Sequence, residues 1–82
     1  MDTEKISEPI DVGAVFGKNK IKPKWFVWQN RKYDIKEVTC AWKAREGEAV
    51  VQYFAVTNGA TSFEISLNQK TMSWRLEKTI LD

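Results

Sequence analysis

Residues 24–35 read K-W-F-V-W-Q-N-R-K-Y-D-I, and this stretch decides the fold of the 82-residue chain. Apolar side chains alternate with others on either side of a polar tetrad at residues 29–32. Asn30 lies inside the tetrad, and asparagine tolerates the positive φ that a tight turn requires. The stretch therefore predicts two antiparallel strands joined by a tight turn, with aromatic and basic residues close together.

Turn signals recur about every ten residues along the rest of the chain, which is typical of a β-sandwich or a β-barrel. Further strands are predicted at residues 10–16, 32–45, 49–57, 62–67 and 72–80. The first of these suits a sheet edge, because Pro9 lacks the N–H that a central strand would use. In the predicted strand at residues 32–45 the apolar residues shift from odd to even positions, so we expect a β-bulge near Lys36 and Glu37.

The predicted fold class is all-β. We expect a small antiparallel meander of five strands plus a short N-terminal edge strand, curved into a barrel-like or open-barrel sheet. Side chains that alternate toward one face, and large aromatic rings in general, are expected in the core. The residues predicted to face it are Phe54, Val56, Phe63, Ile65, Leu67, Trp28, Trp42 and Trp74.

The composition, 43% hydrophobic and 29% charged, is that of a globular protein. Residues 1–8 are rich in charge and have no apolar pattern, so we expect a flexible N-terminal tail followed by a single small β domain at residues 9–82. No apolar run approaches the roughly 20 residues that cross a bilayer, and the N-terminus lacks the apolar segment of a secretory signal. We therefore expect a cytoplasmic monomer with no membrane contact.

The chain has no histidine and a single cysteine. This composition excludes a Ser-His-Asp or Cys-His catalytic arrangement within the chain, and it excludes a zinc site built from cysteine and histidine. No close pair of carboxylates lies in a motif, so we expect no enzyme activity, no cofactor and no metal. Cys40 lies in an apolar-alternating strand, which predicts a buried and inert thiol.

Positive charge is concentrated between residues 18 and 36, where seven basic residues accompany one acidic residue. Lys18, Lys20, Lys22 and Lys24 fall on every second position, which places them on one side of an extended chain. This spacing suits an anion-binding stripe. A solvated loop that discourages edge-to-edge strand pairing would have the same pattern, so both interpretations stay open.

Basic residues beside aromatic rings are typical of single-stranded nucleic-acid binding, in which cations contact phosphates and rings stack on bases. The candidate binding residues are Lys22, Lys24, Trp25, Arg31, Lys32 and Lys36. Trp25 is undecided between the core and the surface. The same basic segment could instead dock an acidic surface of a protein partner.

Four landmarks follow one another along the chain: an E-P-I-x-V segment, a P-x-x-F-x-W-x-x-x-x-Y-x-I segment, a tryptophan and a W-x-L-E-K segment. Their residues are Glu8, Pro9, Ile10 and Val12; Pro23, Phe26, Trp28, Tyr33 and Ile35; Trp42; and Trp74, Leu76 and Glu77. In this order they resemble a family of short uncharacterised prokaryotic all-β domains of unknown function. The family pattern often has glycine where this chain has Asn30. Some members are associated with translesion-type DNA polymerases, so the resemblance implies a DNA-repair context, and it implies no catalytic residue.

The expected function is therefore that of a non-catalytic binding module, with single-stranded nucleic acid in a DNA-repair context as the favoured ligand. The alternative is a protein–protein interaction module that docks a larger enzyme through its basic face or its edge strand. The two hypotheses differ in salt dependence, because phosphate contacts release counterions and weaken steeply with salt.

Overall fold

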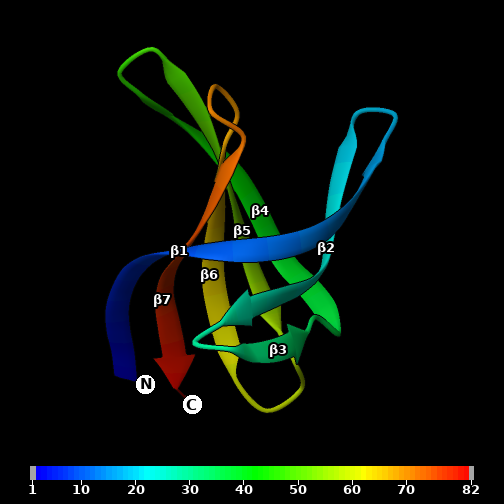
Figure 1. Cartoon of the computed structure of the whole chain (residues 1–82), viewed down its shortest axis with the longest axis vertical. Coiled ribbons are helices and arrows are strands. Elements are labelled where there is room, and N and C mark those ends of the chain that lie inside the picture. Colours follow the sequence, from blue (N-terminus) through cyan, green and yellow to red (C-terminus); the bar gives the residue numbers. More distant parts are fainter. Residues whose placement is uncertain (1, 82) are drawn as a thin grey trace.

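The computed structural model describes residues 2–81, and these residues form one open antiparallel sheet (Figure 1). Its strands are β1 (Asp2–Gly17), β2 (Lys20–Trp28), β3 (Arg31–Asp34), β4 (Glu37–Glu46), β5 (Ala49–Thr57), β6 (Ser62–Asn68) and β7 (Ser73–Leu81). They lie in the order β3-β2-β1-β7-β6-β5-β4. The all-β prediction is confirmed, but the sheet formed by the described residues has seven strands and does not close into a barrel, because β3 and β4 remain its two edges. Across residues 2–81, no helix has the length and apolar content needed to cross a membrane.

β1 is the strand around which the sheet folds over. Its residues 2–10 pair with β7, whereas its residues 11–17 pair with β2. Figure 1 accordingly shows β1 running across the direction of β6 and β7. The strand predicted at residues 10–16 is present, but it is neither short nor at the edge of the sheet order, and residues 2–8, which we expected in a tail, belong to the same strand. Pro9 lies in the half of β1 whose sole neighbour within residues 2–81 is β7, so the strand needs no second donor there.

The predicted first hairpin is confirmed. β2 and β3 are joined at Gln29 and Asn30, whose φ values are 53° and 62°. Two successive residues with positive φ match the twist of a two-residue hairpin turn.

The predicted long return strand at residues 32–45 is wrong, because the strand is interrupted at Ile35 and Lys36. The Ile35 amide donates to Lys24 O at 2.9 Å, and the next amide, that of Lys36, donates to Thr57 O at 2.8 Å. These acceptors lie on β2 and β5, so two consecutive amides donate hydrogen bonds to strands near opposite edges of the sheet. The apolar residues thus shift from odd to even positions because the chain crosses here from one edge strand, β3, to the other, β4.

The core lies where β2 and β3 fold over the larger part of the sheet. Its buried members are Phe26, Phe54, Val56, Phe63, Ile65 and Leu76. The ring of Phe26 stacks on Tyr33 at 5.0 Å and meets Phe63 edge-on at 5.1 Å. The inward orientations predicted for β5 and β6 are confirmed, since the side chains in question are at most 3% exposed.

The predicted burial of Cys40 and Trp42 is wrong. Both are exposed, and Trp42 stacks on Tyr53 at 5.5 Å on the outer face of the sheet. The register between β4 and β5 shifts between Val38 and Cys40, so Thr39 is an extra residue on β4. This bulge reverses the faces of all later β4 residues, which turns Cys40 and Trp42 outward. The other predicted core rings, those of Trp28 and Trp74, are partly buried against the core.

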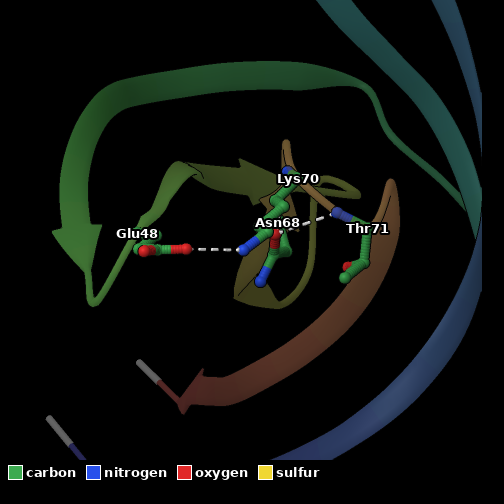
Figure 2. A network of polar contacts seen from close by, with 4 residues as sticks. All are labelled: Glu48, Asn68, Lys70 and Thr71. Atoms are coloured by element: carbon green, nitrogen blue, oxygen red, sulfur yellow. Dashed lines mark hydrogen bonds and ion pairs between the residues drawn. The ribbon is translucent and has the colours of Figure 1, made fainter.

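Side-chain hydrogen bonds shape the β6–β7 turn, and an ion pair connects this turn to the β4–β5 turn. Asn68 Oδ1 accepts from the amides of Lys70 and Thr71 at 2.9 and 3.2 Å, and Lys70 Nζ lies 3.0 Å from a Glu48 carboxylate oxygen (Figure 2). The ion pair is exposed, so it contributes at most about 1 kcal/mol. The Asn68 bonds shape the turn itself, because they satisfy two amides that the strands leave unpaired.

A candidate binding cleft between two strand edges

A cleft of about 810 Å³ opens between the tip of the β1–β2 hairpin and β4. Figure 1 shows the cause, because the β1–β2 and β4–β5 hairpins extend as two diverging arms. Its apolar lining residues are Phe16, Ile21, Val38, Ala41 and Phe54. Phe54 belongs to the core, whereas Phe16 is 56% exposed and faces Ile21 across the hairpin. The floor of the cleft is therefore a continuation of the core that the sheet leaves uncovered.

Charged side chains of mainly one sign line the same cleft. They are Lys20, Lys22, Lys36 and Lys43 together with one carboxylate, that of Glu37. The Lys36 side chain extends toward the β5–β6 turn, since its Nζ lies 3.8 Å from where a Cβ on Gly59 would be. Among the described residues, none of these lysines forms an ion pair with a carboxylate. The cleft therefore has an excess of positive charge that its own residues leave uncompensated.

Both walls of the cleft include backbone that is unpaired within residues 2–81. β3 pairs with β2 from Trp25 to Trp28 and the Ile35 amide bonds to Lys24 O, so within residues 2–81 it is residues 20–23 of β2 that have no neighbour on that side. Within residues 2–81, β4 is an edge strand whose sole neighbour is β5. Unpaired N–H and C=O groups on such an edge are available to another extended chain.

The structure uses Trp25 to cover β1. A Cβ on Gly13 would lie 2.1 Å from Trp25 Cε2, so the half-buried indole rests directly on the glycine backbone. Lys32 Nζ lies over the same ring, 5.4 Å from its centroid, and 3.7 Å from an Asp34 carboxylate oxygen. A nucleic-acid base would have to compete with Lys32 for this ring, so Trp25 is poorly placed to stack on a ligand.

The other sequence-predicted site residues are divided between separate places. Lys22 and Lys36 both line the cleft. Arg31 lies at the β2–β3 turn with its guanidinium carbon 6.0 Å from the centre of the Tyr33 ring. Lys24 is the extra residue of a bulge opposite β1, where the register shifts. The structure therefore brings Trp25 and Lys32 together and places Lys22 and Lys36 along the same cleft, but it does not gather the set into one surface.

The lysine repeat is interrupted at both ends. Lys18 lies in the β1–β2 turn, and Lys24 occupies the bulge, so Lys20 and Lys22 alone keep the two-residue period along β2. Sequence reasoning missed Phe16 and Lys43 as site residues. Neither has a local signal, because each enters the cleft through the way the hairpins diverge.

One ionisable group outside the cleft, the phenol of Tyr53, has a strongly raised pKa. Tyr53 Oη donates a hydrogen bond to Glu46 Oε2 at 2.5 Å. This bond, followed by burial, raises the pKa of Tyr53 to about 12, because both favour the neutral phenol. Tyr53 is therefore a neutral donor at physiological pH, and the bond helps to fix the Trp42–Tyr53 stack.

Comparisons with protein-family models, with curated proteins and with solved structures gave no significant match. The resemblance drawn from the sequence landmarks therefore stays a prediction. Among the described residues, no group of three or more carboxylate or thiol side chains is placed to hold a metal ion.

Proposed function

We propose that this protein is a non-catalytic binding module whose cleft docks an extended, acidic segment of a partner protein. The observation that carries the proposal is the position of the unpaired β4 edge, which borders a lysine-lined cleft with an apolar floor. Sheet edges bind extended peptides through main-chain hydrogen bonds, and pockets beside the edge select the side chains. Uncompensated lysines attract carboxylates and speed the encounter.

The distribution of the lysines suits a chain that lies along the cleft. Lys20 and Lys22 come from β2 on one wall, and Lys43 comes from β4 on the other. A single carboxylate would meet one wall, whereas an extended acidic segment meets both. The resemblance described above suggests a larger enzyme, such as a polymerase, as the owner of that segment.

Charge reversal in the cleft tests this function. A fluorescently labelled acidic peptide is titrated with the native protein and with the Lys22→Glu and Lys43→Glu variants, and binding is followed by anisotropy at low salt. Each variant should bind about tenfold more weakly, because a lysine contact becomes a repulsive one. Lys5→Glu is the matched control, since it makes the same change of charge at an exposed position on β1 outside the cleft. Equal losses in all three variants, or no binding by the native protein, would refute the proposal.

Single-stranded nucleic acid is the second candidate ligand, and the exposed ring of Phe16 favours it. This ring lies in the same cleft as Lys20 and Lys22, so one base could stack while phosphates contact the lysines. Labelled oligothymidylate titrated at several salt concentrations should then give a straight log–log plot with a slope of about −0.7 per phosphate contacted. Phe16→Ala should weaken this binding, since stacking contributes about 1–3 kcal/mol per base. Binding that is indifferent to salt and to Phe16 would exclude this candidate.

A further inference from the structure

β4 has a regular edge that the fold leaves open. After the bulge at Thr39, its pairing with β5 is continuous from Cys40 to Glu46, and no strand within residues 2–81 lies on its other side. Natural edge strands are usually protected by lysine, proline or bulges. Here the bulge protects the start of β4, whereas the next residues, Cys40, Ala41 and Trp42, are exposed and uncharged.

The wall opposite β4 has an alternating pattern. Phe16 and Ile21 face each other on the floor side of the β1–β2 hairpin. Lys20 and Lys22 flank Ile21 along β2, so their side chains point to the other face of that strand. An extended chain beside this wall would therefore meet apolar groups on one face and the ammonium groups of Lys20 and Lys22 on the other, whereas Lys43 of β4 shares the face of Ala41.

We infer that the partner segment binds as an added strand on the edge of β4, with apolar side chains directed to the cleft floor and carboxylates alternating with them on the side of Lys20 and Lys22. This inference rests on the proposed function and gives it a geometry. Ala41 faces inward through its pairing with Phe54, and its small side chain leaves room for the added strand. The occupant is thus an acidic peptide with period-two alternation of apolar and acidic residues.

Backbone methylation of a peptide tests the strand geometry without any assumption about register. The probe is a peptide of about eight residues that alternates valine and glutamate, long enough to span the regular part of β4. Two further versions are N-methylated, one on the amides of all valines and the other on the amides of all glutamates. In an added strand, alternate residues direct their N–H groups toward β4, so one version should lose at least about tenfold in affinity while the other keeps it.

A peptide of the same composition, with its valines and glutamates in two separate blocks, is the control for alternation and should bind more weakly. Hydrogen exchange supplies a second readout, because amides of residues 40–46 should become protected when the alternating peptide binds. If both methylated versions bind alike, strand addition is overturned while acidic docking in the cleft stands.

Other occupants give distinguishable results. If the unmethylated peptide does not bind at all, both the inference and the proposed function fall. Preferential binding of oligothymidylate, with displacement of the peptide, assigns the cleft to nucleic acid and overturns the inference. Concentration-dependent protection of residues 40–46 without peptide, together with dimers in sedimentation, assigns the β4 edge to a second copy of the chain and likewise overturns it.

Discussion

Replacement of Gly13 by alanine is the sharpest test of the close contact between β1 and Trp25. The new Cβ would lie 2.1 Å from Trp25 Cε2 and 2.4 Å from its Cζ2 and Nε1 atoms. Carbon atoms prefer separations of about 3.5–4.0 Å, so the indole would have to retreat by more than 1 Å, roughly. Gly13 does not have a positive φ, so the backbone itself accommodates alanine and the effect isolates the contact.

The expected loss of stability follows from two opposing effects. Overpacking of this kind destabilises by about 1–3 kcal/mol, and the reduced freedom of the unfolded chain returns about 0.4–1 kcal/mol. The net loss should be about 1–2 kcal/mol, or a fall in Tm of about 4–16 °C for a domain of this size. Urea unfolding followed by circular dichroism, together with a thermal melt, measures both quantities.

Two controls make the result specific to the ring. Gly17→Ala changes the same strand at a site where an added Cβ meets nothing within 4 Å, so the stability should be unchanged or slightly raised. In a Trp25→Val background, Gly13→Ala should lose most of its effect, giving a coupling energy of about 1 kcal/mol or more in the double-mutant cycle. The reasoning is refuted if Gly13→Ala is harmless, or if it destabilises equally with and without the indole.

Three further predictions concern the outer face and the turns. Ultraviolet titration of the folded protein should show Tyr53 ionising near pH 12, and Glu46→Ala should move its pKa toward 10, the value of a free tyrosine. Because the pKa of Tyr53 is higher in the folded than in the unfolded state, its contribution to stability is intact below pH 10 or so and should be lost as the pH rises from about 10 through about 12. Asn68→Ala should destabilise by about 1–2 kcal/mol in chemical unfolding, because two turn amides lose their acceptor, whereas Lys70→Ala should change stability by less than about 1 kcal/mol. Cys40 should react with a thiol reagent in the native protein about as readily as in the unfolded chain, and protection that is lifted only by denaturant would contradict its exposure.

The sequence predicted those parts of the fold that local chemistry determines. The turn at Asn30 follows from a residue that tolerates positive φ, and Gly47 and Gly59 likewise occupy turns with φ values of 62° and 99°. The alternation of Phe63 and Ile65 on β6 is confirmed because every second residue faces the same side. Each of these signals lies within a few residues of the feature that it predicts.

The remaining features depend on choices that a local pattern does not distinguish. The shift of apolar residues from odd to even positions in residues 32–45 is compatible with a bulge or with an interruption of the strand. The strand is in fact interrupted at Ile35 and Lys36, and a bulge follows at Thr39. The change of pairing partner along β1, from β7 to β2, has no local sequence signal either, since both neighbours offer the same backbone groups. These long-range choices placed Cys40 on the surface, against the expectation from its apolar neighbours.

The cleft itself follows from the short length of β3. β3 has four residues and β2 has nine, so pairing between them ends at Trp25, and residues 20–23 of β2 extend past it. The link at Ile35 and Lys36 ties both sheet edges together at one end, because its two amides donate to opposite ends of the sheet. From this link the edges diverge, and among the described residues no strand pairs with the free side of β4. A longer β3 would have covered the β2 edge, so the short β3 leaves this wall of the cleft open opposite the free edge of β4.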